Sequence, residues 1–364
     1  MKKSYTGEFD LWKLIAAIVI VIHHSEYLPV EAERTYFHGG SIMVELFFLV
    51  SGFFLAKSAL CGKDFPKNGT RGGDKWNFFV KKIGGTYPYL LFSMIIGVIV
   101  KTAFYHQDFL QLIKNGVRAL TELLFLKSAG WASGTFVPQG WYLSAMMLSI
   151  LILYPCIRKW GRSFVQLFCP VAAVLILGYL FHKFGHFRNP DAWCTFFNKG
   201  LLRGFAEISL GCFCFIVAER VQEIRLTRFA RVLCSVVEYG ALAAIILYSN
   251  TESCWDMDCE SVILMAVAVI IMGSKASILS EVWDKVPVMP WLGKFSMMLY
   301  LNHMYWVWIF AVIGLEMEYP PMLALYYVCS CLSALVCWWV VDYIRTMARR
   351  CRVLLVEEQK DYVA

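Results

Sequence analysis

A series of long apolar stretches limits what this chain can fold into more than any other feature. A helix that crosses a membrane needs about 20 mostly apolar residues, and about ten stretches of the sequence approach this length. They cover residues 11–28, 41–60, 83–104, 139–157, 164–182, 198–218, 232–249, 262–279, 291–313 and 321–341. The chain is 59% hydrophobic and only 17% charged, whereas soluble domains are about 25% charged. We therefore predict an all-α, polytopic transmembrane helical bundle of about ten spans.

The connections leave little room for a second folded unit. No soluble domain of ordinary size fits between the predicted spans, and only a short segment follows the last one. We therefore predict a transmembrane domain over residues 1–341 and a short cytoplasmic tail over residues 342–364.

The positively charged residues are concentrated in every second connection between the predicted spans, which indicates how the bundle is oriented in the membrane. If the N-terminus is cytoplasmic and the spans alternate, six stretches face the cytoplasm, and they hold 25 of the 34 lysines and arginines. These stretches are 1–13, 57–82, 158–163, 219–231, 275–294 and 342–364. The positive-inside rule then predicts an even number of spans with both termini in the cytoplasm. Because the net charge of +7 reports topology in this way, it gives no reason to expect a nucleic-acid partner.

Two outer connections carry features of their own. The longest contains an amphipathic stretch at helical spacing, Phe109–Leu126, which we expect at the outer membrane interface or dipping into the bundle. Another contains Cys254 and Cys259, for which a disulfide and two free thiols are both compatible with the sequence. No group of cysteines and histidines has the spacing of a zinc site, so we predict no metal.

Ionisable residues in the first two spans are the strongest functional signal. An ionisable side chain at membrane depth costs about 2.5–3.5 kcal/mol on insertion scales, yet the first span carries His24 and the second carries Glu45. Both lie about one turn from the outer end of their spans, so their depths match. A carboxylate beside an imidazole suits a general base that acts on a hydroxyl; the alternative is a buried polar network that only fixes helix packing. Lys13, at the inner end of the first span, can also simply snorkel to the interface.

Other polar residues recur near the ends of later spans. Lys81 and Lys82 precede a glycine pair and Pro88 at the cytoplasmic mouth of the third span, where they could hold donor phosphates or anionic lipid heads. Trp141 and Tyr142 begin the fourth span, where aromatic residues form interfacial belts or stack on sugars.

Two further helices carry polar side chains on one face. Arg203 and Glu207 are spaced i,i+4 in the sixth span, so they could neutralise each other or line the same cavity as His24. Tyr300 and His303 share one face of the ninth span with Ser296, and a polar stripe on an apolar helix is expected to face the bundle interior or water.

Taken in order, these motifs resemble the acyltransferase 3 family of integral membrane enzymes. Lys13, ten residues and His24 resemble its first-helix signature of an arginine, ten residues and a histidine. Residues 40–53 (GSIMVELFFLVSGF) resemble its second-helix pattern G-x-x-x-V-[DE]-x-F-F-x-x-S-G-F. Weaker matches extend over essentially the whole chain: the basic residues before Tyr87-Pro88, residues 141–144 (WYLS), residues 203–211 and residues 292–303.

The resemblance implies ten-helix enzymes that transfer acetyl or other short acyl groups from cytoplasmic acyl-CoA to sugar hydroxyls of cell-surface glycans. By motif, His24 is the expected catalytic base and Glu45 its supporting acid. The basic pair is expected to contact the CoA phosphates, together with Lys13. A bacterial plasma membrane is the expected location, with acyl-CoA, a glycan or lipid-linked sugar, and membrane lipids as partners and no permanently bound cofactor. The remaining polar residues are expected to bind substrate or stabilise an oxyanion: Trp141, Tyr142, Arg203, Glu207, Tyr300 and His303.

Two positions depart from the family pattern. Lys13 stands where the first-helix arginine is expected, and the two arginines expected three residues apart in the third helix fall on Lys82 and Gly85. A lysine keeps the charge but loses bidentate phosphate geometry, and Gly85 supplies no side chain. These departures leave open a competing hypothesis, a transporter of a small solute built on the same fold.

Overall fold

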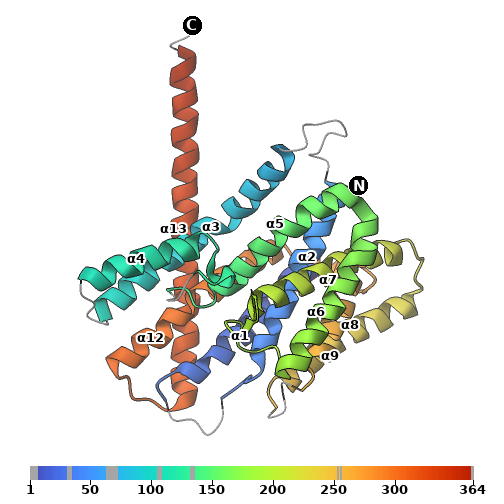
Figure 1. The fold of residues 1–364 in the computed structure, drawn as a ribbon, viewed down its shortest axis with the longest axis horizontal. Helices are drawn as coiled ribbons and strands as arrows, with labels where there is room; N and C mark the ends of the chain where they lie inside the picture. The colour runs from blue at the N-terminus through green and yellow to red at the C-terminus, as the bar shows by residue number, and fades with distance from the viewer. Residues whose placement is uncertain are drawn as a thin grey trace.

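The computed structural model describes residues 7–30, 35–62, 73–104, 109–131, 136–251, 254 and 256–361. These residues are almost entirely helical, as predicted (Figure 1). The α-helices are α1 (Gly7–His23), α2 (Met43–Cys61), α3 (Gly73–Phe104), α4 (Phe109–Leu123), α5 (Gly140–Ser163), α6 (Cys169–Phe184), α7 (Lys199–Gln222), α8 (Arg228–Tyr248), α9 (Asp258–Ser274), α10 (Ser280–Trp283), α11 (Met289–Asn302), α12 (Met304–Ile313) and α13 (Tyr319–Asp361). Shorter elements are the 3-10 helices His24–Tyr27, Gly40–Ile42 and Lys127–Ala129, the π-helix Phe164–Phe168, and the antiparallel strands β1 (Trp193–Cys194) and β2 (Phe197–Asn198).

Within the described residues, seven helices are long and apolar enough to cross a membrane. The α5–α6 pair counts among them as one stretch of 45 residues, although Gly161 interrupts it with a φ of 63° and both halves contact α7. Helices α1 and α9 are 17 residues long each. The polytopic helical class is therefore supported, while the count of ten spans and the cytoplasmic position of both termini stay predictions.

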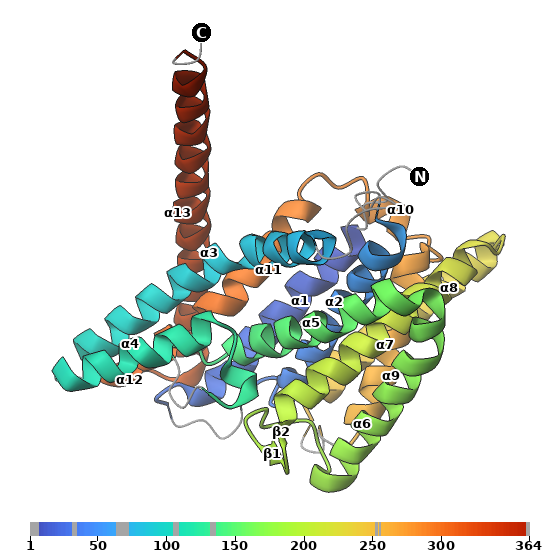
Figure 2. The ribbon, with the colours of Figure 1, turned by 45° about the horizontal axis from the view of Figure 1, so that its top comes forward.

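The centre of the bundle is a close crossing of α2 with α7. A Cβ atom at Gly52 would lie 2.0 Å from the carbonyl oxygen of Ile208, and one at Gly211 would lie 2.1 Å from that of Leu49. Small residues allow membrane helices to approach this closely and to gain packing contacts that lipid cannot replace. Helix α1 packs against both α2 and α11. Glu45, Arg203 and Tyr300 therefore lie on neighbouring helices, and His24 directly follows α1 (Figure 2).

Two helices, α4 and α13, lie on the outside of the bundle. The amphipathic stretch forms α4, on which Leu110 and Val117 leave 60% of their surface exposed while Asn115 and Glu122 are buried. An apolar face turned away from the protein is expected of a helix in contact with lipid. Helix α13 continues without a break past residue 341 to Asp361 and projects beyond the other helices (Figure 1).

Several element boundaries differ from the sequence prediction. Helix α3 begins at Gly73, ahead of the predicted span 83–104. The predicted span 291–313 is divided into α11 and α12 at His303. Cys254 and Cys259 are both free thiols and form no disulfide with each other, and Cys259 lies in the first turn of α9.

Candidate functional site

Two cavities lie one beyond the other along α1 and α2. The first, of about 220 Å³, is lined by Lys13, and the second, of about 450 Å³, by His24. A rise of about 1.5 Å per residue separates these two side chains by about 16 Å along the helix axis. We call them the lysine cavity and the histidine cavity.

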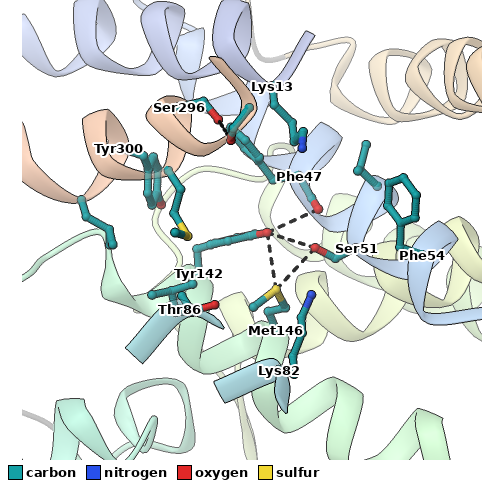
Figure 3. Close-up of a pocket in the computed structure, with 15 residues that line it drawn as sticks. Lys13, Phe47, Ser51, Phe54, Lys82, Thr86, Tyr142, Met146, Ser296 and Tyr300 are labelled. Carbon is teal, nitrogen blue, oxygen red and sulfur yellow. Dashed lines mark hydrogen bonds between the residues drawn. The ribbon is translucent and has the colours of Figure 1, made fainter. Parts of the chain in front are cut away.

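The lysine cavity combines two cationic side chains with apolar and aromatic walls (Figure 3). Lys13 forms an ion pair with Asp10, and Lys82 enters the cavity from α3 one turn before Thr86. The neighbouring Lys81 is exposed and does not line it. The full lining is Lys13, Phe47, Val50, Ser51, Phe54, Lys82, Thr86, Tyr142, Leu143, Met146, Gly293, Ser296, Met297, Tyr300 and Leu301. Of the expected phosphate ligands, the cavity therefore brings together Lys13 and Lys82 and leaves Lys81 outside.

The histidine cavity is more polar and is lined by residues from six parts of the chain. Its lining is His23, His24, Tyr27, Ser41, Val44, Pro138, Gln139, Trp141, Arg188, Asn189, Pro190, Asp191, Arg203, Tyr300 and Met304. The guanidinium of Arg203 stacks over the Trp141 ring, 5.1 Å from its centroid. Trp141 and Tyr142 are consecutive in sequence but line different cavities.

His24 is held in one orientation by its own helix. Its Nδ1 lies 2.8 Å from the carbonyl oxygen of Ile20. Because a carbonyl can only accept, Nδ1 carries the proton, and the neutral ring then presents Nε2 as a lone pair. Nε2 makes no hydrogen bond with any described residue. A free, oriented imidazole nitrogen at a cavity wall is what a general base requires.

Glu45 and His24 are both described by the structure, and the expected contact between them is not formed. Glu45 is fully buried and forms an ion pair with Arg203 instead. The reason is the α2–α7 crossing, which places a guanidinium closer to the carboxylate than the imidazole at the end of α1. The Ile20 carbonyl has the orienting role that we predicted for Glu45, and any influence of Glu45 on the site passes through Arg203.

Arg203 is the centre of a buried cluster of charges. It donates to the Phe187 carbonyl as well as to Glu45, and its Nε lies 3.9 Å from Glu207 Oε1. Neither carboxylate oxygen of Glu207 accepts a hydrogen bond from a described residue. Arg203 and Glu207, the predicted i,i+4 pair, thus form an ion pair. The carboxylate that accepts a hydrogen bond from Arg203, however, is that of Glu45.

Tyr300 and His303 are both buried in the bundle interior, in agreement with the predicted polar stripe, and His303 lies beside His24. The His303 ring lies 4.9 Å from the His24 ring, centroid to centroid, and 6.0 Å from the Tyr300 ring. His303 is fully buried, and its Nε2 has no hydrogen-bond partner among the described residues. It does not line either cavity, so it touches the candidate base and not the open space.

The loop between α6 and α7 supplies site residues that sequence reasoning missed. Arg188 and Asp191 line the histidine cavity. The loop is held by Lys199, whose Nζ donates to the His186 and Arg188 carbonyls at 2.8 and 2.6 Å, and by Asp258, which accepts from the Phe187 N–H. Burial raises the pKa of the Asp258 carboxyl, which precedes the predicted span 262–279, to about 7. The sequence signals only a polar loop here, because its place over the cavity depends on these tertiary contacts.

Comparison with known proteins identifies the family of this chain. A family model described as an acyltransferase domain, acyltransferase 3, matches residues 6–343, nearly the whole chain. No curated protein and no solved structure matches the chain. The match covers every residue of the two cavities, and the chain belongs to the acyltransferase 3 family.

Proposed function

We propose that this membrane acyltransferase moves an acetyl or other short acyl group from cytoplasmic acyl-CoA to a sugar hydroxyl of a cell-surface glycan, in a bacterial plasma membrane. The observation that carries the proposal is the position of His24, whose unprotonated Nε2 belongs to a polar cavity beyond a separate, lysine-lined cavity. Family membership favours the acyltransferase over the transporter hypothesis.

The lysine cavity suits the donor. The phosphates of CoA are anionic, and lysines bind phosphate as point charges. Lys13 and Lys82 are the two cationic side chains of this cavity, and the distribution of positive charge predicts that their end of the bundle faces the cytoplasm. The pantetheine arm would extend from them toward Tyr300.

The histidine cavity suits the acceptor. Sugars present hydroxyls and apolar ring faces, and the cavity offers Trp141 for stacking with Arg188, Asp191 and Gln139 for polar contacts. An acceptor hydroxyl within hydrogen-bond reach of His24 Nε2 would meet the base that the transfer needs.

The transfer then needs one base and one group that stabilises negative charge. His24 Nε2 takes the hydroxyl proton while the oxygen attacks the thioester carbonyl carbon, which gives a tetrahedral oxyanion. The carbon–sulfur bond breaks, the CoA sulfur takes the proton from His24, and the products are the sugar ester and free CoA thiol. Arg203, which lines the histidine cavity, is a candidate donor to the oxyanion, and loss of one such donor typically costs about 10²–10³ in rate.

The test is release of free thiol from acetyl-CoA by the purified chain, with a bacterial glycan fraction as acceptor. His24→Ala should abolish acceptor-dependent release at unchanged protein level. His182→Ala is the matched control, because His182 lies on α6 and lines neither cavity. Full activity of the His24 variant would contradict the base role.

A further inference from the structure

The two cavities meet at one side chain. Among the described residues, Tyr300 alone lines both the lysine cavity and the histidine cavity. The candidate phosphate ligands belong to one cavity and the candidate base to the other. An acyl group that travels from the lysines to His24 by way of these two cavities therefore passes Tyr300.

Three aromatic rings form the wall at this point. The ring of Tyr300 lies 5.8 Å from that of Tyr142 and 6.0 Å from that of Phe47, centroid to centroid. Tyr142 and Phe47 are 5.9 Å apart. Each ring contacts the other two, and they come from α11, α5 and α2. We call this set the aromatic partition (Figure 3).

Hydrogen bonds fix the two tyrosines of the partition. The Tyr300 hydroxyl donates to the Gln139 carbonyl at 3.1 Å, and Gln139 in turn donates through its side-chain amide to the Leu301 carbonyl at 2.6 Å. The Tyr142 hydroxyl lies 3.3 Å from the Phe47 carbonyl oxygen and 3.2 Å from Ser51 Oγ. Tyr300 and Tyr142 are both buried. Each ring is therefore held by the neighbouring rings and by the hydrogen bonds of its hydroxyl group.

We propose that the aromatic partition sets the length of the acyl group and keeps acceptor-side water from the thioester, with Tyr300 as the specificity-determining residue. The inference rests on the proposed function. Its physical reason is that a buried ring held at both ends cannot yield to additional methylenes, and one methylene in a closed pocket typically changes kcat/KM about 10–200-fold. A short acyl group fits beside the ring, whereas a longer one meets it.

Removing the ring has two consequences. The cavities join, so a longer acyl chain finds space. Water from the histidine cavity can also attack the thioester carbon in place of the sugar hydroxyl: the water oxygen bonds to carbon, the carbon–sulfur bond breaks, and the water proton passes through His24 to the CoA sulfur. The products are the free carboxylic acid and CoA thiol, without any acceptor.

The experiment compares acetyl-CoA with hexanoyl-CoA as donors for the purified full chain and for Tyr300→Ala, Tyr300→Leu and Tyr300→Phe. The ratio of kcat/KM values, acetyl over hexanoyl, should fall at least tenfold in Tyr300→Ala and by less in Tyr300→Leu. It should stay within twofold in Tyr300→Phe, which keeps the ring. Acceptor-independent thiol release should rise only in the truncated variants. An unchanged ratio in Tyr300→Leu or in a folded Tyr300→Ala, judged by its melting temperature, would overturn the proposal.

A binding measurement separates this proposal from the proposed function. In a His24→Ala background, which removes the base, the affinities for acetyl-CoA and hexanoyl-CoA are measured with and without Tyr300→Ala. A relative gain for hexanoyl-CoA of at least tenfold supports the partition even if the wild-type chain transfers nothing to a glycan. If the ratio of the two affinities is the same with and without Tyr300→Ala, the partition proposal is overturned even if transfer occurs.

Discussion

Arg345 donates a hydrogen bond to the carbonyl oxygen of Gly84 at 2.8 Å, the oxygen that Pro88 leaves without a helical partner. A proline inside a helix has no N–H to donate to the carbonyl four residues earlier. The same guanidinium donates to the Tyr89 hydroxyl at 3.0 Å and stacks on that ring. Arg345 thus ties α13 to the part of α3 that carries Lys82. It also lies 3.3 Å from the carbonyl oxygen of Gly85, where the family pattern has an arginine.

The first prediction concerns this tie. Arg345→Ala should destabilise the chain by about 1 kcal/mol and raise the KM for acyl-CoA, because the segment of α3 beside Lys82 loses its anchor. Pro88→Ala restores the backbone N–H, so the same Arg345→Ala change should cost less in that background. Thermal unfolding of the four proteins in detergent measures the coupling. Equal losses of melting temperature in both backgrounds would show that Arg345 does not act through the freed carbonyl.

The second prediction concerns the buried charges around Arg203. Arg203→Met leaves Glu45 and Glu207 buried without a cation, which typically costs about 3–5 kcal/mol. Glu45→Gln should cost less, since Arg203 keeps Glu207 within 3.9 Å. Melting temperatures of the two variants test this order. If Glu45→Gln is the more destabilising change, the cluster is not organised around Arg203.

The third prediction concerns the α2–α7 crossing. Gly211→Ala places a Cβ 2.1 Å from the Leu49 carbonyl oxygen, so the helices must move apart, and overpacking of this kind typically costs about 1–3 kcal/mol or more. Gly240→Ala in α8 is the matched control, because an added Cβ meets nothing within 4 Å there. Folded yield and melting temperature should fall in Gly211→Ala alone. Similar behaviour of the two variants would mean that α2 and α7 are not this close.

The fourth prediction concerns pH. Burial raises the pKa of the Glu122 carboxyl, which precedes the fourth predicted span, from 4.5 to about 7, although its oxygens accept the N–H groups of Phe136 and Val137. The folded state then binds this proton more tightly than the unfolded state, so the contribution of Glu122 to stability falls as pH rises from 4.5 to about 7. Glu122→Gln has no proton to lose, so the wild type should lose melting temperature relative to this variant between about pH 5 and about pH 8. A difference in melting temperature that does not change with pH would contradict the shift.

The sequence predicts the fold class and part of the site because both depend on polarity. Apolar length identifies the helices, and the cost of an ionisable group at membrane depth singles out His24, Arg203 and Glu207. Which charged side chains pair with each other, however, cannot be predicted from the polarity of the sequence. Glu45 reaches Arg203 because α2 crosses α7 at two glycines, a contact between residues far apart in sequence. The Ile20 carbonyl that orients His24 has no sequence signal, because every residue carries a carbonyl.

Cavity walls are equally hard to read from sequence. Trp141 and Tyr142 look like one aromatic motif, yet the turn of the helix sends them to different cavities. Arg188 and Asp191 reach the histidine cavity only because Lys199 and Asp258 fold their loop over it. The division of the predicted span 291–313 at His303 depends in the same way on how α11 and α12 pack against α1 and α3.

The most direct test of the account is transfer of an isotope-labelled acetyl group from acetyl-CoA to glycan, measured by mass spectrometry of the glycan. The wild type, His24→Ala and the control His182→Ala are compared at equal protein level and melting temperature. The account predicts labelled ester for the wild type and the His182 variant, and none for the His24 variant. Labelled ester at the wild-type rate from His24→Ala would contradict it.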